Sequence, residues 1–437
     1  MTGMSLPHDL DNGLVLRQAT IDDHDALVEF NSIVHSDDDE PSAFTGASTS
    51  DLLGKHRPHP GSSPGEFTLV EDSATGAIVS SLCLIPQTWR YGEINYPATL
   101  VELVGTRPEY RNRGLVRRQF EVVHGWCEER GIVVQGIAGI PWYYRQFGYE
   151  YALPLSAGRI ARRSQSPKLE GEEPVRLREA VAADAPFIAR LDATNHRRWL
   201  VTAVRDERVW QYEIAGRDPV SDSASHIFVI EQGDGTPIGY VAYTLLPDDP
   251  PWIVSFELVE TASWLNVVPT VLRHLLAVVD ARSDDRPEHY ASLELGADHP
   301  SYIAMPNVLT PTATQYAMYI RVPDLVGFLL RIAPVLEQRL AGSVAHGFGG
   351  ELPINLYRTG LKLTFDGGIL SSVTQERMEY TVAASFPDLT FLQLLFGFRS
   401  MAELNLWYPD CRIRTNEARV LLDVLFPKQP SFVWPVW

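Results

Sequence analysis

Apolar residues near the start of the chain first alternate with polar ones and then recur every third or fourth position. Residues 14–31 therefore predict a short strand followed by a helix, with an aspartate as the helix N-cap. Residues 175–192 repeat this pattern at a constant offset (178 − 17 = 161). The aligned pairs are Leu16 with Leu177, Arg17 with Arg178, Ala19 with Ala180 and Asp23 with Asp184.

The order of elements after each copy is also the same. Strand candidates 67–71 and 78–85 follow the first copy, and candidates 227–231 and 238–245 follow the second. Two related α/β domains in tandem are the simplest account. Chance similarity between two strand-helix starts is the alternative.

Two changes in pattern predict domain boundaries. Residues 162–174 are polar, rich in Pro, Ser, Glu and Gly, and typical of an exposed linker. After 316–322 and Pro323, a helical pattern is followed by alternating strands that turn at 366–368, and then by helical stretches at 389–398 and 416–426. The predicted domains are 1–165, 173–320 and a distinct α+β tail at 321–437.

Composition limits the class of protein. The 437 residues suit two to four domains, and 45% hydrophobic with 21% charged residues exclude a disordered or fibrous chain. No stretch of about 18 uncharged apolar residues exists, and the acidic first 25 residues do not resemble a signal peptide. We therefore expect a cytoplasmic protein with no membrane partner.

Charge and cysteine spacing narrow the partners further. With 37 basic and 55 acidic side chains, the net charge of −18 argues against a nucleic-acid partner and mildly favours cationic ones. Cys83, Cys127 and Cys411 lie far apart, so neither a disulfide nor a metal site is expected. His56 and His59 lie between prolines and do not suggest metal ligation.

The most informative segment is 98–151. A predicted strand at 99–105 leads into Arg111-Asn112-Arg113-Gly114, and a helix follows with apolar positions Val116, Phe120, Val123 and Cys127. Unpaired N–H groups and the positive dipole end of a helix favour an anion, and two arginines add charge. A surface helix with solvated arginines is the alternative.

The run VGTRPEYRNRGLV at 104–116 resembles the acetyl-coenzyme A binding motif of the GNAT acyltransferases, Arg/Gln-x-x-Gly-x-Gly/Ala. Arg111, Gly114 and Val116 occupy its three defined positions, and Val116 departs from the small residue usual there. The run WYYRQFGY at 142–149 resembles a later helix and turn of the same family. The second copy lacks the signature at 256–276, so we expect a degenerate domain that has lost coenzyme binding.

The whole arrangement resembles the enhanced intracellular survival (Eis) acetyltransferases. This implies two GNAT-like α/β domains with mixed sheets, followed by an α+β domain like a sterol carrier protein. It also implies acetyl-coenzyme A as cosubstrate, no metal, a homo-oligomer like the hexameric Eis proteins, and transfer to a primary amine of a cationic small molecule or lysine-containing acceptor. The competing hypothesis is a catalytically idle GNAT fold that binds a lipid or a partner through its tail.

The resemblance also assigns site residues. Main-chain groups of one strand would bind pantetheine and the acetyl carbonyl, and those of the following turn the pyrophosphate: Val104, Gly105 and Thr106, then Arg111, Asn112, Arg113, Gly114, Leu115 and Val116. Tyr144 would protonate the thiolate, and Tyr143 is the second candidate for this role. The alternative is that Tyr144 is only a packed core residue.

The general base stays open. Glu102 precedes Val104 by two positions, which predicts a carboxylate beside the thioester or, alternatively, a salt-bridged strand residue. Eis-like enzymes use the C-terminal carboxylate instead, here that of Trp437. The acidic run 37–40 lies where GNAT folds place a substrate-covering loop, although a solvated loop is the more common meaning of such a run.

Overall fold

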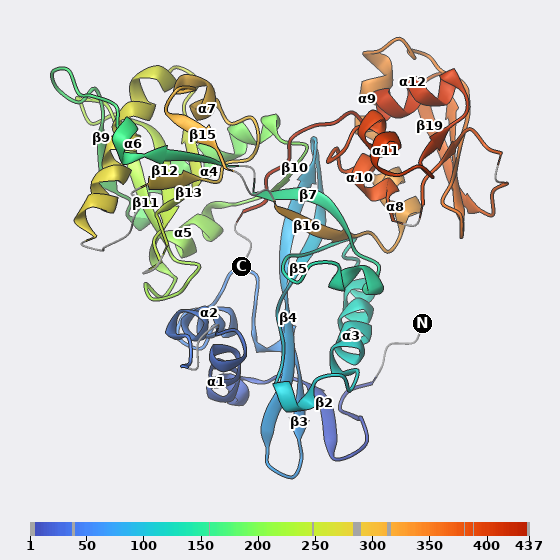
Figure 1. The fold of residues 1–437 in the computed structure, drawn as a ribbon, viewed down its shortest axis with the longest axis horizontal. Helices are drawn as coiled ribbons and strands as arrows, with labels where there is room; N and C mark the ends of the chain where they lie inside the picture. Colours follow the sequence, from blue (N-terminus) through green and yellow to red (C-terminus); the bar gives the residue numbers. More distant parts are fainter. Residues whose placement is uncertain are drawn as a thin grey trace.

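A computed structural model describes residues 5–36, 40–156, 158–246, 249–282, 290–312, 316–379, 381–387 and 389–434. The described residues form three sheets, each with its own helices (Figure 1). The second domain and the tail lie on either side of one end of the long strands of the first sheet (Figure 1). The expected fold class, two α/β domains with mixed sheets followed by a further domain of helices and strands, is confirmed.

The first sheet has nine strands in the order β1-β2-β3-β4-β5-β6-β16-β7, with β10 paired to β4. These strands are β1 (His8–Asp9), β2 (Leu14–Gln18), β3 (Phe67–Asp72), β4 (Ala77–Tyr91), β5 (Ile94–Thr106), β6 (Val134–Ile137), β7 (Glu150–Ser156), β10 (Val201–Ala203) and β16 (Tyr316–Arg321). Its helices are α1 (His24–Val34), α2 (Ala43–Leu53) and α3 (Leu115–Glu129), with 3-10 turns η1 (Ile21–Asp23), η2 (Pro64–Glu66), η3 (Pro108–Tyr110), η4 (Tyr143–Phe147) and η5 (Arg163–Gln165).

The second sheet runs β15-β8-β14-β13-β12-β11-β9. Its strands are β8 (Arg159–Arg162), β9 (Arg176–Glu179), β11 (Ser225–Glu231), β12 (Pro237–Thr244), β13 (Trp252–Leu258), β14 (Tyr290–Leu293) and β15 (Leu309–Pro311). The helical elements are η6 (Ala182–Asp184), α4 (Ala185–Asn195), η7 (His196–Arg198), α5 (Glu207–Ala215), α6 (Trp264–Ala281) and α7 (Pro300–Ala304). Among the described helices, α6 alone is long and apolar enough to cross a membrane, and its apolar face packs in the core of this domain.

The tail sheet runs β19-β18-β17-β20-β21. Its strands are β17 (Gly350–Asn355), β18 (Gly360–Asp366), β19 (Ile369–Glu376), β20 (Ala384–Ser385) and β21 (Arg412–Ile413). Its helices are α8 (Leu325–Arg331), α9 (Ala333–Ala341), α10 (Phe391–Leu395), α11 (Met401–Trp407) and α12 (Asn416–Leu425). The pattern at 325–342 thus forms two helices that meet at Ile332, where Pro334 occupies the first turn of α9.

The sequence repeat corresponds to one repeated cluster of charged side chains. In the first copy the Arg17 guanidinium bonds Asp23 at 2.7 Å and Glu71 at 2.7 Å. In the second, the Arg178 guanidinium bonds Asp184 at 2.7 Å and Glu231 at 2.5 Å. Each aspartate also accepts the N–H of the residue three positions before it, so the matched Arg and Asp fix the same strand-to-helix turn twice.

This cluster changes the interpretation of the first aspartate. Asp23 does stand at the N-cap of α1, but its side chain accepts no bond from that helix. It binds the Thr20 N–H at 2.8 Å and Arg17 instead, and so holds the 3-10 turn before the helix. The predicted strand-to-helix start and the N-cap position of the aspartate are confirmed, and the side chain stabilises the turn before the helix.

The sheets exchange strands across the predicted domain borders. β8 precedes the predicted linker but lies in the second sheet, where it pairs with β14 and β15. β10 pairs with β4, and β16 inserts between β6 and β7 of the first sheet. One apolar core also continues from the first domain into the tail, where the Tyr91 hydroxyl donates to the Leu395 carbonyl at 2.7 Å. Residues 1–165, 173–320 and 321–437 therefore stay predictions of folding units.

Candidate functional site

The candidate site is a cavity of about 1100 Å³ at the point where β5 and β6 part. The two strands pair in parallel only between Ala98–Leu100 and 134–136. Beyond Leu100 the ladder to β6 ends, and residues 101–106 of β5 line the cavity. Their backbone N–H and C=O groups on that edge are available to a ligand.

A β-bulge lies on β5 inside this cavity. Cys83 of β4 faces Glu102 and Ser81 faces Gly105, so the two residues Leu103 and Val104 oppose a single residue of β4. Leu103 has φ = 52°, in the left-handed region that leucine rarely adopts. A bulge takes backbone groups out of the ladder, and such strain persists where the surroundings impose it, often at functional sites.

Close packing of α1 on β5 explains the glycine next to the bulge. A Cβ atom on Gly105 would lie 2.7 Å from Val34 Cγ1 and 3.2 Å from His35 Nε2. The Gly105 carbonyl accepts the hydroxyl of Ser80 at 2.9 Å. The cavity wall at this position is therefore bare backbone, held between α1 and β4.

The N-terminus of α3 forms the opposite end of the cavity. Asn112 and Gly114 have φ = 63° and 77°, and the first helical bond runs from Arg118 N–H to the Gly114 carbonyl at 3.1 Å. No side chain caps the helix, and a Cβ on Gly114 would meet no atom within 4 Å. Free N–H groups, an open approach and nearby arginines suit a pyrophosphate. This end of the cavity therefore fits the phosphates of the coenzyme that the motif implies.

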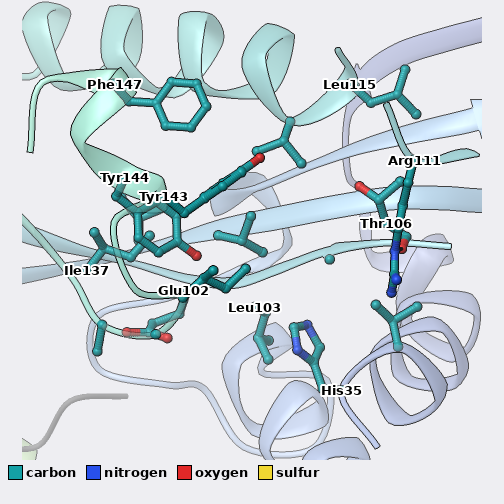
Figure 2. Close-up of a pocket in the computed structure, with 18 of the residues that line it drawn as sticks. His35, Glu102, Leu103, Thr106, Arg111, Leu115, Ile137, Tyr143, Tyr144 and Phe147 are labelled. Carbon is teal, nitrogen blue, oxygen red and sulfur yellow. Dashed lines mark hydrogen bonds between the residues drawn. The ribbon is translucent and has the colours of Figure 1, made fainter. Parts of the chain in front are cut away.

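The turn η4 carries two tyrosines into the cavity from the wall opposite β5 (Figure 2). Left-handed backbone at Trp142 and Gly148 brackets this turn. Tyr144 is 3% exposed, whereas Tyr143 is partly exposed. Burial, and secondarily the charge of Glu102, raises the pKa of the Tyr144 phenol well above its ordinary value. Tyr144 therefore stays protonated at neutral pH and can donate a hydrogen bond.

Glu102 lies in the same cavity, below the two tyrosines in the view of Figure 2. Its Oε1 atom is buried without a hydrogen-bond partner, and no ion pair to it exists among the described residues. Burial, and then the nearby Asp222 carboxylate, raises the pKa of Glu102 to about 8. The structure thus lacks the salt bridge that was the alternative role for this glutamate.

Sequence reasoning missed several titratable groups of the cavity, among them His35 and Asp222. His35 ends α1, and burial lowers its pKa despite the opposing effects of the Leu103 backbone and Asp222. Asp222 comes from the loop after α5 of the second domain, where its carboxylate accepts the Ser48 hydroxyl of α2. Residues so distant in sequence carry no local signal that would place them together.

Most predicted site residues meet in this one cavity, although their roles stay predictions. The lining includes Glu102, Val104, Gly105, Thr106, Arg111, Asn112, Arg113, Gly114, Leu115, Val116, Tyr143 and Tyr144. Trp437 and residues 37–39 lie outside the described residues. Among the described residues no group of three His, Cys, Asp or Glu side chains could hold a metal ion. His59 is half-buried, and partial loss of solvation lowers its pKa to about 3.

Comparison with known proteins places this site in a family context. Residues 15–152 match the family model of the acetyltransferase (GNAT) domain. A search of curated proteins finds no match. The fold of the full chain resembles that of several solved structures.

Three of these structures extend over nearly the whole chain. They are a probable N-acyltransferase from Enterococcus faecalis (13% identity, TM-score 0.67, 96% of this chain and 98% of that one), a GCN5-related N-acetyltransferase from Anabaena variabilis (15%, 0.66, 96% and 99%), and Eis1 from Mycobacterium abscessus (16%, 0.58, 96% and 99%). At these identities the likeness establishes a shared three-domain fold.

Replacing Gly114 should separate ligand approach from backbone strain. Gly114→Val should weaken coenzyme A binding about tenfold or more, because a branched side chain would occupy the approach to the helix N-terminus. Gly76→Val is the matched control, since Gly76 has φ = 73°, no atom within 4 Å of an added Cβ, and a position outside the cavity lining. Calorimetric titration measures both, and equal affinities in the two variants would contradict the assignment.

Proposed function

We propose that this chain, whose residues 15–152 form a GNAT acetyltransferase domain, transfers the acetyl group of acetyl-coenzyme A to a primary amine of a cationic small molecule or lysine-containing acceptor. One observation carries the proposal. A single cavity contains the open N-terminus of α3, the unpaired edge of β5 with its bulge, and the buried phenol of Tyr144.

The residues present fit acetyl-coenzyme A as cosubstrate, which supplies an activated acyl thioester. N–H groups at the start of α3, with Arg111 and Arg113, would bind the pyrophosphate. The unpaired edge of β5 would pair with the amides of the pantetheine arm as a neighbouring strand does. Backbone N–H groups at the Leu103–Val104 bulge would face the acyl carbonyl as oxyanion donors.

The chemistry then requires a base and a hydrogen-bond donor. The neutral amine attacks the thioester carbonyl carbon, a base takes the proton that the nitrogen loses, and the C–S bond breaks to release the coenzyme A thiolate. Tyr144 would donate to the departing sulfur. Because burial raises its pKa, a hydrogen bond to the thiolate is favoured over complete proton transfer.

Glu102 is the base that the cavity supports best. Its Oε1 atom has no hydrogen-bond partner among the described residues, and burial raises its pKa to about 8, so the ionised form is a stronger base than an ordinary carboxylate. The carboxylate of Trp437 and an ordered water stay as alternatives. The described chain before Trp437 ends at Trp434, whose ring contacts the Trp210 ring and the Arg205 guanidinium.

Charge supports a cationic acceptor. Asp222 and Glu102 line the same cavity, and the charge of Asp222 raises the pKa of Glu102. A cation between them would offset that repulsion and favour ionised Glu102. Cytoplasmic location and a homo-oligomeric state belong to the same proposal. The tail interior is filled by buried apolar side chains such as Phe386 and Leu394, and no specific observation favours a lipid-binding role.

Thiol release measured across an amine panel tests the function and the acceptor class. We expect turnover with cationic primary amines and little with neutral apolar amines. Asp222→Asn should raise KM for the cationic amine about tenfold, because a charged partner is lost, without weakening coenzyme A binding. Asp218→Asn is the matched control, since Asp218 lies in the same loop outside the cavity lining. Equal KM values in both variants would exclude Asp222 from acceptor binding, and no turnover with any amine would contradict the enzyme assignment.

Replacing Tyr144 tests the donor to sulfur. Tyr144→Phe should lower kcat about 10²-fold or more, with little change in coenzyme A affinity, because the hydroxyl acts on the developing thiolate. Tyr143→Phe removes the neighbouring hydroxyl and should have a small effect. Steady-state kinetics and titration separate the two quantities. Unchanged kcat in Tyr144→Phe would move the role to Tyr143 or to water.

The pH profile tests the base. A carboxyl with a pKa of about 8 is protonated below that pH, so kcat/KM should rise as the pH increases through about 8. Glu102→Gln should abolish this limb, and Asp222→Asn should shift its midpoint to lower pH because a repelling charge is removed. The same acceptor amine is used with the unmodified protein and both variants, so that ionisation of the amine affects all three profiles equally. An unchanged limb in Glu102→Gln would leave the C-terminal carboxylate or water as base.

A further inference from the structure

A second cavity, of about 570 Å³, lies between the first two domains. The first domain supplies the loop 59–63 and residues 85–88 of β4, and the second supplies 203–206 and one side of α5. This cavity shares no lining residue with the larger one. Ligand binding in this cavity therefore does not require the proposed function.

The carboxylates around this cavity already have partners. Glu213 binds Arg217 through two bonds of 2.8 Å, and Glu66 binds Arg130, which lies outside the lining, at 2.5 Å. Asp206 accepts the Val209 N–H at 3.0 Å as the N-cap of α5. These acids are therefore not free to receive a cationic ligand.

Donors in the same lining, by contrast, are left over. Arg205 is 5% exposed; its Nε and Nη2 bind Asp192, and its Nη1 has no hydrogen-bond partner. The hydroxyl of Ser62 is also buried without a partner. A buried donor without an acceptor costs free energy, and a charged donor costs more than a neutral one. We therefore expect a cavity with two such donors to bind a group that accepts hydrogen bonds.

The position of the Arg205 guanidinium is fixed, and in the lining the formal charges of three arginines balance those of three carboxylates. The Arg205 guanidinium lies 5.2 Å from the ring centroid of Trp210 and 5.0 Å from that of Trp434, in addition to its pair with Asp192. Arg208 donates to the Pro60 carbonyl and has no carboxylate partner among the described residues. After burial, the charges of Arg217 and Arg208 further lower the pKa of His59, consistent with a positive potential at that wall.

We propose that this cavity binds a small oxyanion, a phosphate or carboxylate group of a metabolite, through Arg205 Nη1, Arg208 and the Ser62 hydroxyl. An oxyanion presents several acceptor atoms and a negative charge to these donors. Because the walls come from both domains, the bound anion ties the loop 59–63 to α5 and stabilises the domain interface.

Thermal unfolding and calorimetric titration of the full chain test the site with inorganic phosphate and, separately, acetate, against chloride at the same ionic strength. We expect a raised unfolding temperature and saturable binding with at least one oxyanion. Saturable binding of phosphate alone would identify a phosphate ligand. Saturable binding of acetate would identify a carboxylate ligand. An absence of saturable binding with both anions would overturn the proposal and leave water as the partner of these donors.

Two arginine variants locate the bound anion, because the N-terminus of α3 is also an anion site. Arg208→Gln should weaken oxyanion binding at least about fivefold, and Ser62→Ala several-fold, without loss of folding, since Arg208 is exposed and the Ser62 hydroxyl has no partner. Arg111→Gln is the matched control and should leave this binding intact. The proposal would be overturned if oxyanion binding were lost in Arg111→Gln but retained in Arg208→Gln. It would also be overturned if both variants retained oxyanion binding.

Discussion

The parting of β5 from β6 after Leu100 is the constraint on which the larger cavity depends. Packing is tight at Gly136, the last β6 residue paired with β5, where an added Cβ would lie 2.8 Å from Leu100 Cδ2 and 3.0 Å from the Trp89 ring. On its other edge β6 pairs at residues 135–137 with β16, a strand from much later in the chain. β5 is left with an unpaired edge, and backbone polar groups in such a place need a partner from outside the sheet.

The second domain shows the same fold with the equivalent edge closed by side chains. β13 pairs with β14 only through Trp252 and Ile253, so the parting of strands is repeated. The His299 ring donates to the Phe256 carbonyl at 2.8 Å, where a ligand amide would otherwise bind. Trp264, the first residue of α6, packs against Phe256 and His299. These contacts give a physical reason for the missing coenzyme signature of this copy.

The second domain also contributes to the lining of the larger cavity. Its loop after α5 brings Asp222 to the wall beside Ser48. Because the Ser48 and Ser221 hydroxyls lie 2.7 Å apart, this loop is fixed against α2 of the first domain. The end of the cavity at Asp222 therefore depends on how the two domains pack, whereas the end at the N-terminus of α3 is formed by the first domain.

Local signals in the sequence predicted the local parts of this structure. The repeated strand-to-helix turn followed from matched residues such as Arg17 and Arg178, and the turn before α3 from Gly114 and its neighbouring arginines. The strand exchange of β8, β10 and β16 could not be predicted, because a strand's pattern specifies which face is buried and not which partner it pairs with.

The bulge on β5 and the position of Asp222 could not be predicted from the sequence either. Leu103 adopts a left-handed backbone, at the bulge opposite β4, without the glycine that usually signals one. The i, i+2 rule used for Glu102 and Val104 assumes a regular strand, yet the bulge lies between them. Asp222 reaches the site only through tertiary contact, which no short window of sequence contains.

Basic and acidic side chains lie at different ends of the larger cavity, which the net charge of the chain does not show. The sequence carries −18 overall, yet arginines 111, 113 and 117 surround the N-terminus of α3 and carboxylates 102 and 222 lie toward the other end. A ligand with phosphates at one end and a thioester at the other has one favourable orientation in such a field, with its phosphates at the arginines. That orientation directs the thioester toward the Leu103 bulge, between the phenol of Tyr144 and the carboxylates that would receive a cationic amine.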